Sequence, residues 1–343
     1  MSAGRNPQVS KHIRFCPIPF DHLNKESRRY ATCCPGWLDG TRFVYEHNAD
    51  PWQTWNHPTL VELRQAVLDQ DWRFCQKCPN RYRVQDRDGP RADDKAIMER
   101  PPVTVGFGDN MTCNLRCPSC RTHIVREQTT QGPSVAEICD GFDGRLPTVA
   151  LNVSGDPFAN AEHRAFMQSE GPEDLIIWTN GVLLPRYWDS IQRKVTVLLT
   201  SIDAATKETY EWVRQPAKWP QLMACLAKCH EIVASKQLEI WQCNFVVQAR
   251  NFREMPAFAE MCIEYGATAV QYTPIAPWQH ITPEQWHDRN IQNPHHPDYS
   301  EYLDVLQDPL LQLPGVDVGL VSPQSTQWFA NAAPQQNYFS IQP

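Results

Sequence analysis

Three cysteines on one short segment could hold an inorganic cluster. Cys113, Cys117 and Cys120 are separated by three residues and then by two, in the segment CNLRCPSC. Thiolates are the usual ligands of iron–sulfur clusters, and a closed four-iron cluster takes four of them. Three thiolates on one loop could therefore bind three irons and leave the fourth iron open to a substrate or cofactor, as catalytic zinc sites leave one position open.

A second set of cysteines lies nearer the start of the sequence and could hold one more cluster. It consists of Cys16, the adjacent Cys33 and Cys34, and the close pair Cys75 and Cys78. With one residue of the Cys33/Cys34 pair, this set supplies four thiolates, which could bind a metal site. The choice within that pair stays open.

Zinc is the alternative metal, because zinc and iron–sulfur clusters both accept tetrahedral thiolate ligands. A shared zinc site would pair Cys75 and Cys78 with Cys117 and Cys120 across a gap of 38 residues, where zinc ribbons use about 15–20. It would also leave Cys113 without a role. The three-cysteine segment therefore favours an iron–sulfur cluster, while zinc remains the alternative for the N-terminal set.

The composition restricts the class of protein. The chain has 343 residues and a formal net charge of −7, which suits about two domains and argues against a generic nucleic-acid binder. The N-terminus lacks the apolar segment of a signal peptide, and no apolar run approaches the roughly 18 residues of a membrane span. We therefore expect a cytoplasmic protein with no membrane or nucleic-acid partner, whose thiols stay reduced. Five further cysteines are expected to be buried packing residues: Cys139, Cys225, Cys229, Cys243 and Cys262.

Short apolar runs alternate with helical segments after residue 102, and these are the elements that must position the cysteines. Six runs read as strands, at 103–107, 148–153, 175–178, 195–202, 238–247 and 269–274. Helix candidates follow them at 134–142, 161–168, 186–192, 205–213, 220–234 and 252–265. This alternation predicts βα units and a parallel sheet, with too few units for a full eight-unit barrel. The predicted fold class is α/β, a partial parallel (β/α)6 TIM-like barrel with an N-terminal loop-rich iron–sulfur module.

The pattern divides the sequence into four regions. Residues 1–84 form the N-terminal module, with one helix expected near 58–70. The charged, apolar-poor residues 85–102 form a linker. Residues 103–276 form the barrel, and residues 277–343 are loop-rich and are expected to cover the barrel or to be partly disordered.

The cysteine loop and the residues at the ends of the next strands resemble the radical SAM superfamily. In a parallel barrel, the loops after the strands form the reactive face. Polar motifs end the second, third and fourth predicted strands, and an arginine closes the helix that follows: Ser154-Gly155-Asp156-Pro157, Thr179-Asn180-Gly181, Ser201-Ile202-Asp203 and Arg214. The resemblance covers about residues 103–275. It implies a [4Fe–4S] cluster on Cys113, Cys117 and Cys120 that binds S-adenosylmethionine through its open iron.

The sequence departs from the superfamily pattern at two positions. The turn of Ser154, Gly155 and Asp156 resembles the one that binds the methionyl amino group, but its acidic residue is usually glutamate, which reaches further. The residue before the last cysteine is usually aromatic and packs near adenine, whereas here it is Ser119. Both substitutions are mild, so the resemblance stands.

The other strand-end residues resemble further contacts with S-adenosylmethionine. Asn180 belongs to the motif that is common at the end of the third strand, and Ser201 and Asp203 resemble the ribose-contacting position. Arg214 resembles an arginine that meets the methionyl carboxylate. A planar guanidinium suits a carboxylate because it can donate two parallel hydrogen bonds.

The N-terminal cysteines resemble an auxiliary-cluster module of the SPASM or twitch type, although that module usually follows the barrel and here precedes it. The resemblance covers about residues 13–80. It implies an auxiliary [4Fe–4S] cluster held by Cys16, Cys33, Cys75 and Cys78, with Cys34 as the alternative to Cys33.

Together the resemblances imply a radical SAM enzyme with oxidoreductase or isomerase-type chemistry. Such an enzyme cleaves S-adenosylmethionine reductively and uses a 5′-deoxyadenosyl radical to abstract a hydrogen from its substrate. We expect a flavodoxin- or ferredoxin-type electron donor. The substrate could be a peptide, modified by epimerisation, crosslinking or oxidation as in natural-product or ribosomal-peptide pathways, or it could be a sugar, nucleoside or small metabolite. A non-catalytic electron-transfer protein with two clusters is the alternative of a different class.

Overall fold

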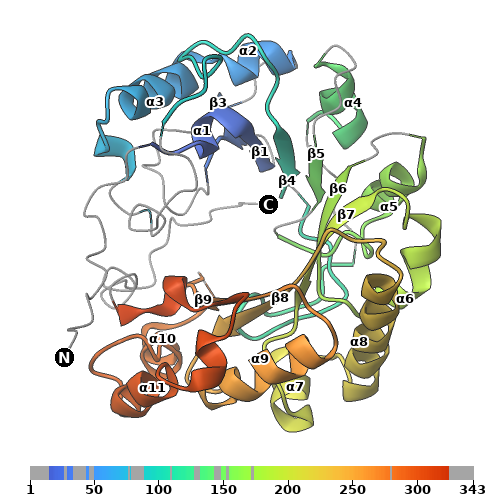
Figure 1. Cartoon of the computed structure of the whole chain (residues 1–343), viewed down its shortest axis with the longest axis vertical. Helices are drawn as coiled ribbons and strands as arrows, with labels where there is room; N and C mark the ends of the chain where they lie inside the picture. The colour runs from blue at the N-terminus through green and yellow to red at the C-terminus, as the bar shows by residue number, and fades with distance from the viewer. Residues whose placement is uncertain are drawn as a thin grey trace, which may run out of the picture.

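The computed structural model of the chain describes residues 15–26, 29–33, 44–45, 50–75, 78, 89–108, 110–126, 132–142, 148–151, 154–170, 174–278 and 280–323. One sheet of ten strands runs through this part of the chain. Helices line the outside of the sheet, and the colours show that its strands follow each other largely in chain order (Figure 1).

Six neighbouring parallel strands form the centre of the sheet and match the six predicted runs. They are β4 (Thr104–Phe107), β5 (Thr148–Leu151), β6 (Leu175–Thr179), β7 (Val195–Ser201), β8 (Ile240–Val247) and β9 (Ala269–Pro274). Each pairs in parallel with the next. The predicted α/β partial parallel barrel is therefore confirmed.

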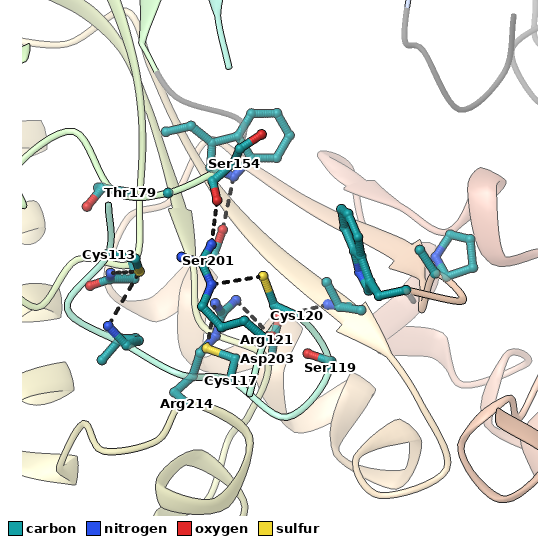
Figure 2. A pocket seen from close by; sticks show the side chains of 18 residues that line it. Cys113, Cys117, Ser119, Cys120, Arg121, Ser154, Thr179, Ser201, Asp203 and Arg214 are labelled. Carbon is teal, nitrogen blue, oxygen red and sulfur yellow. Dashed lines mark hydrogen bonds and ion pairs between the residues drawn. The ribbon is translucent and has the colours of Figure 1, made fainter. Parts of the chain in front are cut away.

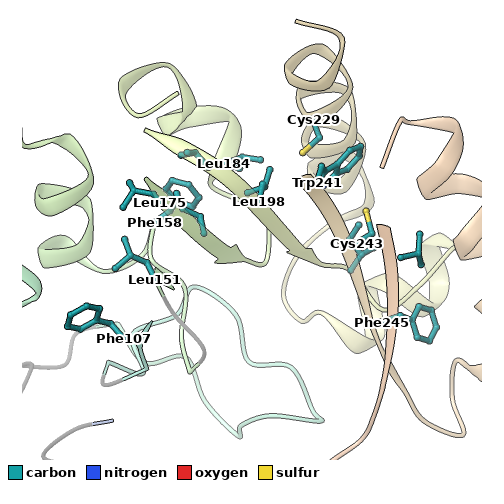
Figure 3. Close-up of a cluster of buried hydrophobic side chains, with 14 of the residues drawn as sticks. Phe107, Leu151, Phe158, Leu175, Leu184, Leu198, Cys229, Trp241, Cys243 and Phe245 are labelled. Atoms are coloured by element: carbon teal, nitrogen blue, oxygen red, sulfur yellow. The ribbon is translucent and has the colours of Figure 1, made fainter. Parts of the chain in front are cut away.

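Helices between these strands cover the outer face of the barrel. They are α4 (Val135–Asp140), α5 (Ala161–Gln168), α6 (Leu184–Tyr187), α7 (Lys207–Val213), α8 (Trp219–Ala234) and α9 (Met255–Glu264), with 3-10 turns η4 (Trp188–Ser190) and η5 (Phe252–Glu254). Alternate side chains of a strand face the same side, so Trp241, Cys243 and Phe245 of β8 all enter the core (Figure 3). The Phe245 ring lies 4.8 Å from that of Phe258 on α9. The five cysteines predicted as packing residues are all buried: Cys139, Cys225, Cys229, Cys243 and Cys262.

Three N-terminal strands extend the same sheet and were not predicted. β1 (His22–Glu26) pairs in parallel with β4, β2 (Arg29–Ala31) pairs antiparallel with β1, and β3 (Val44–Tyr45) pairs antiparallel with β2. The sequence of β1 is HLNKE, so no apolar run marks it. The helical elements of this region are α1 (Ile18–Asp21), α2 (Pro51–Trp55), α3 (Pro58–Leu68) and the 3-10 turn η2 (Arg73–Cys75), and α3 matches the helix expected near 58–70.

The described part of the expected linker packs against the N-terminal helices. The Arg100 carbonyl accepts a hydrogen bond from Trp55 Nε1 at 3.0 Å. Met98 is buried, and its backbone exchanges hydrogen bonds of 2.8 and 2.9 Å with the side chain of Asn56. The charged composition of residues 85–102 does not predict these contacts, because they use backbone atoms. The positions of the domain boundaries stay a prediction.

In the C-terminal region, the described residues add two helices and one strand. They are α10 (Pro283–Arg289), α11 (Tyr299–Val305) and β10 (Val316–Asp317), which pairs in parallel with β9; the 3-10 turns are η6 (Pro309–Gln312) and η7 (Gly319–Val321). The strand order of the whole sheet is β10-β9-β8-β7-β6-β5-β4-β1-β2-β3. Residues 324–343 lie outside the described residues. Within the described part, no helix has the length and apolar character needed to cross a membrane.

One buried arginine holds the N-terminal elements together. Arg64 of α3 is fully buried and donates hydrogen bonds to the carbonyls of Pro19 at 2.8 Å, Trp55 at 2.7 Å and Ala96 at 3.1 Å. Its guanidinium also lies 4.0 Å from the centre of the Trp55 ring. The ends of α1 and α2 and the segment around Ala96 therefore depend on a single side chain.

Arg64→Met is expected to lower the free energy of unfolding by about 3–5 kcal/mol, because two buried carbonyls and one partly buried carbonyl lose their donor. Arg73→Met is the control, since Arg73 is exposed, forms ion pairs with Glu62 and Asp71, and lies over the Phe74 ring at 4.7 Å. That change should cost less than about 1 kcal/mol. Urea unfolding of both variants measures the difference, and equal losses would contradict the bracing role of Arg64.

Candidate functional site

The three-cysteine loop lies at the carboxyl end of β4 and is folded tightly by backbone hydrogen bonds. The Cys113 N–H donates to the Val125 carbonyl at 2.8 Å, which closes the loop on itself. The Cys120 N–H donates to the Cys117 carbonyl at 2.9 Å, which forms a turn between these two cysteines. The loop thus presents its cysteines at the edge where the parallel strands end, as predicted from the barrel topology.

A cavity of about 260 Å³ opens beside this loop (Figure 2). Its walls come from the cysteine loop, the turn after β5, the ends of β6, β7 and β8, and the segment after β9. The predicted site residues that line it are Cys113, Cys117, Cys120, Ser154, Gly155, Asn180, Ser201, Asp203 and Arg214. The fold therefore gathers residues from four separate strand ends around one space.

The sulfur of Cys113 has two nitrogen neighbours. The Leu115 N–H donates to it at 3.4 Å, and Asn180 Nδ2 lies 3.8 Å away. Asn180 is held in place because it donates to Asn114 Oδ1 at 2.9 Å and accepts from the Val182 N–H at 3.0 Å. The end of β6 thus reaches the cysteine loop directly.

Two arginines approach the other two sulfurs. Arg214 Nη1 lies 3.8 Å from Cys117 Sγ, and Arg121 Nε lies 3.4 Å from Cys120 Sγ. Both arginines are buried. Since a cation beside a thiol favours the thiolate, each of the three cysteines has a donor or a cation suited to the charged form.

Burial opposes the ionisation of these thiols when no metal balances the charge. It raises the pKa of Cys117 to about 12, a rise to which Cys120 and Cys113 add and which Arg214 opposes. Burial also raises the pKa of Cys113, against the effect of Arg121. A metal must replace the thiol proton to bind. Iron would supply the missing positive charge, and the N–H donors around the sulfurs suit cluster thiolates, so the donor set fits an iron–sulfur cluster.

Asp203 and Arg214 form a buried ion pair at the end of β7. Asp203 Oδ2 lies 2.7 Å from Arg214 Nη2, and Oδ1 accepts from the Val246 N–H at 2.7 Å. The backbone of Asp203 is left-handed, with φ of +68°, and its carbonyl accepts from Asn251 Nδ2 at 2.9 Å. The carboxylate therefore joins β7 to β8 and holds Arg214 at the cavity wall.

Asp156 is a predicted cofactor residue that is not among the described residues lining the cavity. It is fully buried. Its carboxylate accepts from Thr179 Oγ1 at 2.7 Å, from the Asn180 N–H at 2.8 Å and from the Phe158 N–H at 3.0 Å. It braces the turn after β5 against the end of β6, and its contact with a cofactor stays a prediction.

Cys16, Cys75 and Cys78 of the N-terminal set all affect the pKa of Cys33. Burial raises the pKa of Cys33 well above its usual value, and Cys16, Cys75 and Cys78 raise it further, so these three thiols lie close enough to act on its charge. Cys34 lies outside the described residues. Within the described part of the chain, no three Cys, His, Asp or Glu side chains are arranged around one point as ligands of a single metal ion.

Some residues of the site were not predicted from the sequence. Arg121 lines the cavity, and its position directly after Cys120 was the available signal, since basic residues favour thiolates. Trp178 and Trp278 add two indole rings to the wall. Trp178 ends a predicted strand, whereas Trp278 belongs to a region that showed no regular pattern.

The C-terminal region holds the cysteine loop from the other side. The Pro118 carbonyl accepts from Arg289 Nη1 at 2.9 Å, and His280 Nε2 lies 3.1 Å from the same oxygen. The Arg289 carbonyl in turn accepts from the Ala249 N–H at 2.9 Å. His280, which precedes α10, and Arg289, its last residue, therefore fix the cysteine loop to the barrel.

Gly155 occupies a point where the turn after β5 meets the cysteine loop. A Cβ atom there would lie 2.4 Å from the Thr112 carbonyl oxygen and 2.7 Å from that of Asn110. The next residue, Asp156, donates its N–H to the same Thr112 oxygen at 2.8 Å. Glycine permits this close approach, so any side chain must push the loop away.

Gly155→Ala is accordingly expected to lower the free energy of unfolding by about 1–3 kcal/mol through overpacking. Gly89→Ala is the matched control, because no atom lies within 4 Å of the added Cβ, and it should change stability by less than about 0.5 kcal/mol. Denaturant unfolding compares the two. A Gly155→Ala protein as stable as the control would show that the loop does not need this contact.

The comparisons with known proteins gave matches among solved structures only: no family model and no curated protein matches the sequence. SuiB of Streptococcus suis, bound to S-adenosylmethionine, is 13% identical with a TM-score of 0.42, over 62% of this chain and 48% of that chain. A radical SAM methyltransferase from Sphaerobacter thermophilus is 16% identical with a TM-score of 0.39, over 60% and 61%. The protein anSMEcpe with bound AdoMet is 15% identical with a TM-score of 0.37, over 59% and 61%.

These similarities are distant. The chain spans about half the length of that SuiB chain. In the spacing of its three cysteines and in its strand-end motifs, the chain resembles enzymes of the radical SAM superfamily.

Proposed function

We propose that the protein is a radical SAM enzyme, in which Cys113, Cys117 and Cys120 hold a [4Fe–4S] cluster and the adjoining cavity binds S-adenosylmethionine. The observation that carries the proposal is that the three thiols, each beside an N–H donor, line the same cavity as the predicted strand-end residues. Three thiolates leave one iron of a four-iron cluster without a protein ligand. That iron is the position at which a cofactor would bind.

A structural zinc site fits this cavity less well. Such a site is closed by four protein ligands, usually cysteine or histidine. The described residues that line the cavity include three cysteines and no histidine, and the carboxylate of Asp203 is already paired with Arg214. The donor set therefore supports an open cluster rather than closed zinc.

When bound, the cluster supplies the electron that cleaves S-adenosylmethionine, and the protein supplies binding and orientation. Arg214 has five N–H groups, of which it uses three, toward Asp203, Cys117 and the Ile202 carbonyl. We assign the remaining N–H groups to the methionyl carboxylate. The ion pair with Asp203 fixes the guanidinium in the orientation that this contact needs.

The tryptophans of the cavity suit the adenine ring. Aromatic side chains bind purines by stacking, and Trp178 and Trp278 offer such surfaces where the loop itself has only Ser119. Trp178 is held by a hydrogen bond of 2.9 Å from Nε1 to Ser201 Oγ. The Ser201 hydroxyl can still donate its own hydrogen, which supports its assignment to the ribose.

The N-terminal cysteines Cys16, Cys33, Cys75 and Cys78 are assigned to an auxiliary [4Fe–4S] cluster. The support is the sequence resemblance, together with the rise in the pKa of the Cys33 thiol that burial causes and to which Cys16, Cys75 and Cys78 add. Four thiolates close a cluster, so this one would have no iron open to S-adenosylmethionine. Its proposed role is to take an electron from the substrate radical.

The proposal covers both substrate classes that the sequence left open, a peptide and a small molecule. One structure of SuiB contains its precursor peptide, SuiA. The alternative of a two-cluster electron-transfer protein would not need a cavity lined by the cysteines and the strand-end residues together.

Anaerobically reconstituted protein is expected to hold roughly eight irons per chain, four for each cluster. Replacing Cys113, Cys117 and Cys120 with alanine should leave about half of the iron, because the auxiliary cluster remains. Cys139→Ala removes a buried cysteine outside both sets and should keep all of it. Iron, sulfide and zinc analysis measures this, and stoichiometric zinc without iron would contradict the proposal.

A further inference from the structure

Arg121 is a buried cation at the centre of the cysteine loop. Its side chain bridges two backbone segments, since Nη1 donates to the Met111 carbonyl at 2.6 Å and Nη2 donates to the Ser154 carbonyl. Its Nε lies 3.4 Å from Cys120 Sγ (Figure 2). One guanidinium therefore contacts the start of the loop, its last cysteine and the turn after β5.

The charge of Arg121 has no carboxylate partner among the described residues. Its contacts there are two neutral carbonyls and a thiol, and only 8% of the residue is exposed. Arg214, on the other side of the same cavity, is by contrast neutralised by Asp203 at 2.7 Å. A buried charge is costly unless an opposite charge accompanies it. An anion at the position of the cysteine sulfurs would therefore stabilise the buried guanidinium of Arg121.

Thiolates that carry a cluster would provide this anion. Reduction adds one more negative charge to the cluster, and a cation held beside one of its sulfurs stabilises the reduced form more than the oxidised form. The potential of an iron–sulfur cluster responds to net charge, to hydrogen bonds on its sulfurs and to burial, and Arg121 supplies all three at Cys120.

We propose that Arg121 is a positioning residue that raises the reduction potential of the barrel cluster and so helps the electron to enter it. This inference rests on the proposed function, because it needs a cluster on the cysteine loop. The Arg121 side chain has two separate effects. Its charge raises the reduction potential of the cluster, and its hydrogen bonds to the Met111 and Ser154 carbonyls hold the loop in place.

The test compares three variants of the full chain, reconstituted anaerobically. Arg121→Gln removes the charge, and Arg121→Lys keeps the charge but cannot reproduce both carbonyl contacts together with the contact to sulfur. Arg116→Gln is the control, since it removes the same charge from an exposed position on the same loop, where solvent and salt screen it. Iron content is measured first. A redox titration followed by electron paramagnetic resonance then gives the potential of the signal that changes on adding S-adenosylmethionine.

We expect Arg121→Gln to keep its iron and to shift this potential to more negative values, with Arg121→Lys and Arg116→Gln close to the wild type. An unchanged potential in iron-replete Arg121→Gln would overturn the inference. So would the loss of iron from both Arg121 variants, because Arg121 would then act only as a brace. A wild-type chain that binds no iron would instead show that the proposed function itself is wrong.

Discussion

Thiolates that are buried side by side repel one another, and the residues around the three cysteines can offset this repulsion. Each sulfur faces a nitrogen donor, and two of the donors are guanidinium groups. These neighbours favour the charged form of the sulfurs, which is the form that binds a metal. Asn180, Arg121 and Arg214 therefore place N–H groups or positive charge where the proposed cluster thiolates would lie.

The parallel sheet brings these donors to one place. Strands that run side by side in the same direction end at the same edge, so residues after β4, β5, β6 and β7 meet although they lie far apart in the sequence. Two buried carboxylates then lock neighbouring strand ends together. Asp156 joins the turn after β5 to the end of β6, and Asp203 joins the end of β7 to β8 while it holds Arg214.

The barrel could be predicted from the sequence because its strands are short apolar runs and these runs alternate with segments of helical pattern. The strands at the two sides of the sheet could not, since β1 is polar and β3 and β10 have two residues each. The segment around Met98 reads as a charged linker because its contacts use backbone atoms, which composition does not reveal. Long-range hydrogen bonds of this kind leave no local pattern.

The cysteines and most of the strand-end residues of the site were predictable because their chemistry and order are distinctive. The bracing role of Asp156 was not, since burial and three hydrogen-bond donors decide it. Trp278 and the two contacts to the Pro118 carbonyl come from a region without periodicity. Residues placed by tertiary packing alone therefore had to be found in the structure.

The most direct measurement is the formation of 5′-deoxyadenosine from S-adenosylmethionine by the reconstituted chain, anaerobically and with dithionite as reductant. The wild type should form it slowly without substrate, and the variant with alanine at Cys113, Cys117 and Cys120 should form none. A folded Cys75→Ala/Cys78→Ala variant should still form it, because only the barrel loop leaves an iron open. An iron-replete wild type that forms none, or a triple variant that forms it at the wild-type rate, would contradict the assignment of these three cysteines.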